Sequence, residues 1–187
     1  LTPVAKGERN SVGFRFHPQT GKLWFTDNGR DWLGDNKPPC ELNRLDKVGQ
    51  HFGFPYCHGD DILDEEYGKG KDCSNYTAPV QNLGPHVAPL GFVIYSGDQF
   101  PEEYKNNIII AEHGSWNRSK KIGYRLTRVV VNSKGKGIKY EDFVTGWLQK
   151  DDEQWGRPVD ILQEKSGSIL VSDDYASAIY RISYSPQ

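Results

Sequence analysis

The sequence lacks methionine altogether and contains only three cysteines among its 187 residues. It also lacks any run approaching the ~18 apolar residues that a membrane-spanning helix needs, so no transmembrane segment is expected. So few cysteines exclude a disulfide-dense mini-protein. A content of 36% hydrophobic and 12% aromatic residues excludes a disordered tail. Because the chain opens on Leu1, we expect it to begin inside a longer protein.

The chain has no excess of charge of either sign. It carries 23 basic and 25 acidic residues, a net charge of −2, and its basic residues are dispersed. No nucleic-acid partner is therefore expected. The densest basic cluster, at 118–125, is short and is interpreted as a solvated turn. The sequence shows no signal peptide, so the compartment must be inferred from other features.

The three cysteines divide into a pair and a single thiol. Cys57 and Cys73 flank a polar loop, at a separation that would suit one disulfide in an oxidising compartment. Cys40 would then be left as the unpaired thiol.

Glycine and proline are plentiful, with 20 and 11 copies, and they separate short β-rich runs. Three hairpins recur in the same form, in which the second strand ends on an acidic residue. The hairpins cover 12–27, 90–112 and 158–173, and the residues that end them are Asp27, Glu112 and Asp173. Hairpins repeated in this way are typical of propeller blades.

Further strands are expected after each hairpin, at 42–45, at 124–131 and 140–145, and at 178–182. The sequence therefore predicts an all-β fold with about three blades of a β-propeller, fewer than a closed ring needs. A β-sandwich is the alternative. The stretch 98–104 is expected to form a helical turn capped by Asp98. The long loop 56–85 shows only weak strand signals.

Four segments carry residues suited to chemistry. Arg9-Asn10 offers planar donors for a carboxylated ligand. The oxygen-rich loop 26–36 is of the kind that supplies carbonyl and carboxylate oxygens to Ca²⁺. His113, in the segment 112–118, is a candidate acid, base or ligand donor, and Arg157 stands before the third hairpin. Each segment also has a purely structural interpretation, as a surface arginine or a polar turn.

Arg9 and Arg157 occupy equivalent positions, just before the first and the third hairpin. Equivalent positions in two blades face the same axis, so we expect both arginines to project into one central cavity.

Several blocks of the sequence resemble the glucose/sorbosone dehydrogenase family. They are Arg9-Asn10 with Gly13, Asn28-Gly29, Glu41-Leu42-Asn43 and Phe52-Gly53-Phe54-Pro55. The blocks 111–118 and 155–159, closing on 172–174, are similar to its sorbosone dehydrogenase-like branch. The resemblance covers nearly the whole chain in the same order. It implies a six-bladed β-propeller in the full protein, of which residues 1–187 would be a partial propeller domain, the C-terminal half.

The resemblance also implies a cofactor, pyrroloquinoline quinone (PQQ), and a catalytic Ca²⁺. Arg9 and Asn10 would contact the quinone, and Arg157 would meet one of its carboxylates. Gly29 and Arg30 would give backbone carbonyls to the metal, although the family can have proline where this chain has Arg30. Either His113 or Arg118 would be a further cofactor contact.

The catalytic base is expected to be absent from this chain. The resemblance implies a histidine upstream of Arg9, and none of the five histidines matches that position. His17 is expected to be exposed in a hairpin turn. His51 and His86 are expected to make local hydrogen bonds, and His58, beside Asp60 and Asp61, is a candidate for a second metal site. Alone, the chain is expected to be inactive.

The resemblance implies oxidation of a sugar or related alcohol or aldehyde by hydride transfer to PQQ, with an external electron acceptor. Its members work outside the cytoplasm, so a periplasmic or secreted location is expected. One alternative is a Ca²⁺-dependent propeller hydrolase or lactonase, in which Asp27, Glu112 and Asp173 ring a metal. A non-catalytic binding propeller is the other. A carboxylated cofactor requires arginines, whereas a metal hydrolase requires mainly carboxylates and amides.

Overall fold

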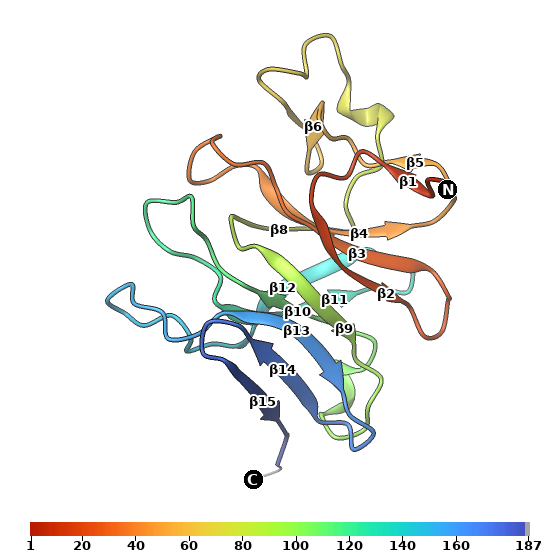
Figure 1. Ribbon diagram of the computed structural model, residues 1–187. Helices are drawn as coiled ribbons and strands as arrows, with labels where there is room; N and C mark the ends of the chain where they lie inside the picture. The colour runs from red at the N-terminus through yellow and green to blue at the C-terminus, as the bar shows by residue number, and fades with distance from the viewer. Residues whose placement is uncertain (186–187) are drawn as a thin grey trace.

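The computed structural model describes residues 1–185 and is almost entirely β-structure (Figure 1). The first sheet has the order β2-β3-β4-β8, the second β12-β11-β10-β9, and the third β13-β14-β15. Neighbouring strands in these three sheets are antiparallel. Because each strand pairs with the one before it in its sheet, each sheet is a meander of the kind that forms a propeller blade.

The strands of these sheets are short, as the turn-rich sequence predicts. Those of the first sheet are β2 (Ser11–Phe16), β3 (Leu23–Asp27), β4 (Pro39–Leu45) and β8 (Gln81–Pro85). Those of the second are β9 (Pro89–Ile94), β10 (Ile108–Glu112), β11 (Arg125–Val131) and β12 (Gly137–Val144). Those of the third are β13 (Pro158–Gln163), β14 (Ile169–Asp173) and β15 (Ala178–Ile182).

Shorter elements lie outside these three sheets. β1 (Ala5–Lys6) pairs in parallel with β5 (Gln50–His51), and β6 (Cys57–His58) pairs with β7 (Ile62–Leu63). Two short 3-10 helices, η1 (Cys73–Asn75) and η2 (Glu102–Tyr104), lie in connections. Among residues 1–185 no helix has both the length and the apolar character needed to cross a membrane.

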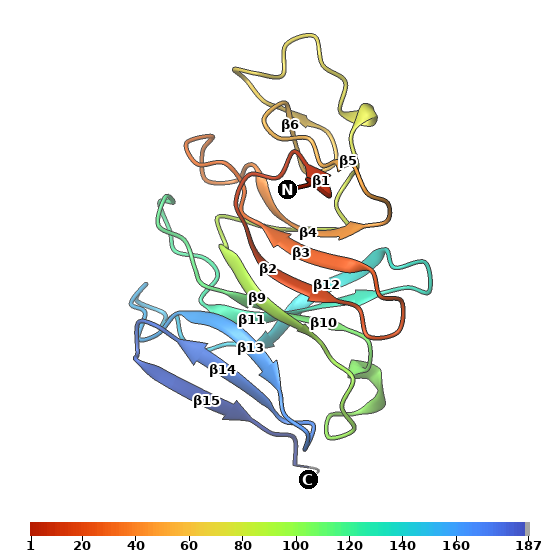
Figure 2. The same cartoon turned by 45° about the vertical axis from the view of Figure 1, so that its right-hand side comes forward.

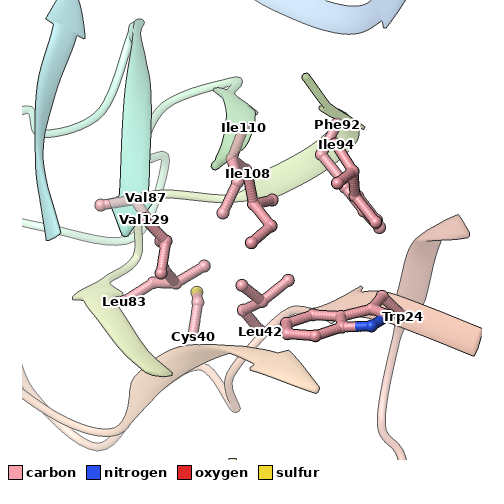
Figure 3. Close-up of a cluster of buried hydrophobic side chains, with 10 residues drawn as sticks. All are labelled: Trp24, Cys40, Leu42, Leu83, Val87, Phe92, Ile94, Ile108, Ile110 and Val129. Carbon is pink, nitrogen blue, oxygen red and sulfur yellow. The ribbon is translucent and has the colours of Figure 1, made fainter. Parts of the chain in front are cut away.

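The three sheets stack in one row, with the second sheet in the middle (Figure 2). One hydrophobic cluster fills the space between the first and second sheets and includes Trp24, Leu42, Phe92 and Ile108 (Figure 3). A separate cluster, which includes Ile109, Leu126 and Val171, joins the second sheet to the third. Burial of these side chains is the main stabilising contribution to the stack.

The first strands of the sheets, β2, β9 and β13, lie side by side, with β9 between the other two. This close approach requires glycine. A Cβ on Gly13 of β2 would lie 2.2 Å from the backbone oxygen of Leu90. On Gly91 of β9 it would lie 2.7 Å from the Cα of Asp160 in β13. Both positions therefore exclude any larger residue in the present packing.

The strands predicted in three groups are found in three antiparallel sheets, and the sandwich alternative is wrong because these sheets form a row rather than a facing pair. The sequence does not predict β8, since its residues have weak strand propensity and gain their strand structure from pairing with β4.

The cap predicted for Asp98 is also wrong. η2 begins after Pro101, and Asp98 instead pairs with the Nζ of Lys105 at 2.7 Å.

The disulfide predicted between Cys57 and Cys73 is present, and Cys40 is a buried free thiol. The bridge closes a loop that protrudes from the first sheet, at the top of Figure 1.

Candidate functional site

The backbone at Arg9 and at Arg157, just before the first strand of each sheet, is held by the same kind of hydrogen bond. The backbone N–H of Arg9 donates to Asp27 at 3.0 Å, and that of Arg157 donates to Asp173 at 2.9 Å. In both sheets the carboxylate at the end of the second strand holds the residue that precedes the first strand. These matching hydrogen bonds show that Arg9 and Arg157 occupy equivalent positions in their sheets, as the repeat predicts.

Arg9 lies at a small hollow on this edge of the first sheet. The hollow has a volume of about 120 Å³ and is lined by Arg9, Asn10, Gly29 and, among others, His86 and Trp116. The Arg9 guanidinium donates to the Asn28 carbonyl at 3.3 Å and to Asp31 at 3.0 Å. The structure thus brings together three predicted site residues, with Arg9 held by a carboxylate that an anionic ligand would have to displace.

The Gly29-Arg30 segment is held tightly against β4. A Cβ on Gly29 would lie 2.6 Å from the Pro39 oxygen, so the backbone approach leaves no room for a side chain. The Gly29 and Arg30 carbonyls accept no hydrogen bond from residues 1–185. Asp31 follows directly and is only partly exposed. Unpartnered carbonyls beside a carboxylate are oxygen donors of the type that Ca²⁺ prefers.

The Arg30 side chain turns away from these carbonyls into the disulfide-closed loop. Its guanidinium lies 2.5 Å from Asp64 and 3.1 Å from Glu66. Asp64 is fully buried and also bonds His58 at 2.8 Å. Burial by itself would raise the pKa of Asp64, but the hydrogen bonds from Arg30 and His58 hold that pKa well below its usual range. The loop is therefore clamped to the first sheet by a buried charge.

Arg157 and His113 lie on the matching edge of the second and third sheets. The Arg157 side chain donates to the carbonyls of His113 and Gly114, at 3.0 and 2.8 Å, and lies 5.3 Å from the centre of the Tyr124 ring. His113 Nε2 pairs with Asp174 at 2.9 Å. Arg157 thus fixes the backbone of the loop that carries His113.

Arg118 occupies a different place, since it ties two loops of neighbouring sheets together. It donates to the Asp35 carbonyl at 3.1 Å and to the Asn36 side chain at 3.3 Å. Beside it, Trp32 and Trp116 meet edge to face with ring centres 5.7 Å apart, and both are exposed. Of the two candidates for a further cofactor contact, Arg118 is occupied by bonds between these loops.

The three acidic residues that end second strands do not converge on one point. Asp27 and Asp173 hold the backbone before β2 and β13, and Glu112 accepts from Arg125 at 2.8 Å and from Thr127 at 3.0 Å. Burial raises the pKa of Asp27 and of Glu112. Within the described residues no three His, Cys, Asp or Glu side chains gather in a group that could hold a metal.

A family model described as TrAA12-like matches residues 2–185. The chain belongs to the TrAA12-like family. It is 46% identical over 183 residues to an uncharacterized protein of Borreliella burgdorferi, covering 97% of this chain and 48% of that protein. The chain thus spans about half the length of this relative.

Solved structures share the fold of this TrAA12-like chain. The calcium structure of the Trichoderma reesei carbohydrate-active enzyme of family AA12 has a TM-score of 0.80 at 21% identity, over 95% of this chain and 52% of that one. The holo form of the pyranose dehydrogenase PQQ domain from Coprinopsis cinerea has a TM-score of 0.76 at 20% identity, over 97% and 55%. The apo form of the soluble aldose sugar dehydrogenase from Escherichia coli has a TM-score of 0.68 at 21% identity, over 98% and 46%. This likeness supports the β-propeller class.

The histidines of this TrAA12-like chain follow the predictions in part. His51 and His86 make local bonds, to the Gly53 N–H at 3.1 Å and to the Gly34 carbonyl at 2.8 Å. The exposure predicted for His17 is wrong, because the turn folds its ring against Trp24 and leaves it 8% exposed. His58 faces Asp64 rather than its sequence neighbours Asp60 and Asp61.

Sequence reasoning missed the contributions of Asp64 and Trp32 to this region. Asp64 lies 34 residues from Arg30, and nothing in the polar loop distinguishes it from its acidic neighbours. Trp32 lay within the oxygen-rich loop, but its partner Trp116 belongs to another sheet. Only the folded arrangement brings these pairs together.

Proposed function

We propose that this chain is the C-terminal half, residues 1–187, of a propeller enzyme that oxidises a sugar or related alcohol at a CH–OH group. The family membership and the likeness to sugar dehydrogenase structures support an oxidoreductase. The finer assignment is to a PQQ- and Ca²⁺-dependent quinoprotein of the sorbosone dehydrogenase-like branch. The six-bladed ring and its closure belong to the same proposal.

The main support for this proposal is that an arginine stands at the same position before the first strand of two sheets, at one edge of the stack. Arg9 and Arg157 are anchored identically through Asp27 and Asp173. A cofactor with several carboxylates is best held by planar, permanently charged donors in fixed positions. The hydrolase alternative gains no support, because the carboxylates that it requires are engaged in holding strands.

The residues present fit a calcium-assisted quinone. Arg9, Asn10 and Arg157 would hold the quinone and its carboxylates, with His113 or Arg118 as a further contact. The Gly29 and Arg30 carbonyls would hold the metal, since neither accepts a hydrogen bond within the described chain. When bound, Ca²⁺ and PQQ supply a Lewis acid and an acceptor for the substrate hydride.

This chain's own residues position the reacting groups. Arg9 would hold a cofactor carboxylate in place of Asp31, and Asp31 would then be free beside the Gly29 and Arg30 carbonyls. Arg157 keeps the His113 loop in place through two carbonyls. The base that takes the hydroxyl proton is proposed to be a histidine of the preceding blades. We further propose an external electron acceptor and a periplasmic or secreted location, which the disulfide supports.

The test is reconstitution of the full-length parent protein with Ca²⁺ and PQQ, followed by dye-linked oxidation of a panel of sugars. We expect cofactor-dependent dye reduction that falls at least tenfold in Arg9→Ala, the factor of one charge-assisted hydrogen bond. Arg181→Ala is the matched control, because Arg181 is exposed on the last strand and pairs with Glu164. Lactone hydrolysis without dye reduction would overturn the proposal.

A further inference from the structure

A second hollow lies beside the turn that joins β2 to β3, at the far end of these strands from Arg9. We call it the basal hollow, and its volume is about 370 Å³. It lies between the β2–β3 turn and the β11–β12 turn, which Figure 2 shows on the same side of the stack. At ~3.3 Å per residue, the distance from Arg9 to His17 is roughly 25 Å. The basal hollow is therefore separate from the candidate functional site.

The lining of the basal hollow is basic. Its charged side chains are Lys22, Arg44, Lys105 and Lys134, and no acidic residue lines it. The whole chain has a net charge of −2, so this bias is local.

Carboxylates outside the lining pair with three of these cations. Asp46 bonds both Lys22 and Arg44, while Asp98 and Glu102 bond Lys105. The side chains of Asp98 and Glu102 are 89% and 83% exposed, so water and salt screen them. Lys134 is exposed and makes no ion pair within residues 1–185, so its positive charge is uncompensated there.

The uncharged groups of the lining add hydrogen-bond donors. Trp24 is a lining residue whose indole N–H has no acceptor in the described chain; that N–H is shielded from solvent, so it reports on binding nearby rather than acting as an open donor. His17 Nδ1 accepts from the Gln19 N–H at 3.2 Å, which leaves the proton of the neutral ring on Nε2. The Asn132 side-chain oxygen accepts from the N–H groups of Lys134 and Lys136, which leaves the side-chain NH₂ group as a donor.

Positive charge and hydrogen-bond donors define the complementary ligand. Phosphate is anionic and presents acceptor oxygens on every side, whereas a neutral sugar would leave the charge of Lys134 uncompensated. We infer that the basal hollow binds a phosphate group, either free or carried by a small ester. The hollow lies within the volume range of small-molecule sites, so an ester has room beside its phosphate.

The site does not depend on the proposed oxidoreductase function. Every lining residue belongs to the first two sheets or their connections, and none is a proposed cofactor contact.

The test follows the five tryptophan indole N–H signals by NMR during titration with inorganic phosphate at constant ionic strength. We expect the Trp24 signal, assigned with Trp24→Phe, to shift saturably while those of Trp32 and Trp155 stay unchanged. Lys134→Gln should weaken phosphate binding about tenfold, the effect of one charge-assisted hydrogen bond. Lys69→Gln, an exposed lysine in the disulfide-closed loop, should leave binding unchanged.

Parallel titrations with glucose 6-phosphate and glucose distinguish the sources of the phosphate. Tighter binding of the ester than of inorganic phosphate assigns the hollow to a sugar phosphate or similar ester, and equal or weaker binding assigns it to the free anion. Both results require that glucose itself does not shift the Trp24 signal. The inference is overturned if neither phosphate ligand shifts that signal, or if Lys134→Gln binds as tightly as the unmodified chain.

Discussion

Arg15 of β2 and Asp160 of β13 meet across the strand that separates them. The Nη2 group of Arg15 donates to both carboxylate oxygens of Asp160, at 2.8 and 3.1 Å, although the residues lie 145 positions apart. The pair passes over Gly91 of β9, where a Cβ would lie 1.9 Å from Asp160. The first and third sheets are thereby joined over the second.

Gly91→Ala is expected to lower the free energy of unfolding by about 2–3 kcal/mol, since the added Cβ overlaps the β13 backbone as well as the Asp160 side chain. Chemical denaturation measures the loss. Asp160→Asn is the control that removes the ion pair alone. Both partners are well exposed, so it should cost less than about 1 kcal/mol, and less still at high salt. Equal losses in the two variants would contradict the packing explanation.

Glu41 is expected to make stability depend on pH. Burial raises the pKa of this carboxyl to about 7, despite donation from the Asn43 side chain and the Gly59 N–H. Between its unfolded pKa and about 7 the folded protein binds the extra proton, so its stability falls as pH rises across that interval. Denaturation between pH 5 and pH 8 in calcium-free buffer measures this slope.

Glu41→Gln is expected to reduce that slope, because the amide does not titrate. It should also lower stability at pH 5, because the amide has one oxygen for the two donors, the Gly59 N–H and the Asn43 NH₂ group, from which Glu41 accepts. Glu65→Gln, an exposed carboxyl paired with Lys37, is the matched control and should keep the slope of the unmodified chain. If the slope persists in Glu41→Gln, other buried carboxyls such as Asp27 and Glu112 are its source.

Asp64→Asn is expected to cost about 3 kcal/mol of stability, since it leaves Arg30 without its buried counter-charge. Glu66→Gln removes the exposed partner of the same guanidinium and should cost less than about 1 kcal/mol. Thermal unfolding of both variants measures the difference. A small loss in Asp64→Asn would mean that the disulfide alone holds the loop to the first sheet.

Arg118→Ala is expected to loosen the edge between the first two sheets, because it removes the bonds to Asp35 and Asn36. Hydrogen exchange should then speed up at residues 32–36 and stay unchanged in β10, a buried central strand. Lys120→Ala is the neighbouring control, as only its backbone carbonyl meets Arg118. Unchanged exchange at 32–36 would show that the Trp32–Trp116 contact suffices to hold the edge.

The sequence predicted the sheets well because their signals are local. Alternating β-rich runs, turn residues and the terminal acidic residues all lie within single hairpins, as at Asp27 and Asp173. The equivalent placement of Arg9 and Arg157 could be inferred for the same reason.

What could not be predicted depends on contacts between distant segments. β8 gains its strand structure from pairing with β4, and His17 is buried because the turn folds onto Trp24. The clamp between Arg30 and Asp64 requires the disulfide-closed loop to fold back on the first sheet. Neither secondary-structure propensity nor the spacing of residues in the sequence predicts such contacts between distant segments.

The two hydrophobic clusters also determine the order in which the three sheets are expected to unfold. One cluster belongs to the first and second sheets and the other to the second and third, so each outer sheet is supported from one side within the described chain. Such a stack behaves as a short chain of nearest neighbours. Loss of the third sheet can leave the first two folded, whereas loss of the middle sheet removes the support of both others. For residues 1–185 taken alone, unfolding should therefore begin at an end of the row, with the central sheet as its last cooperative unit.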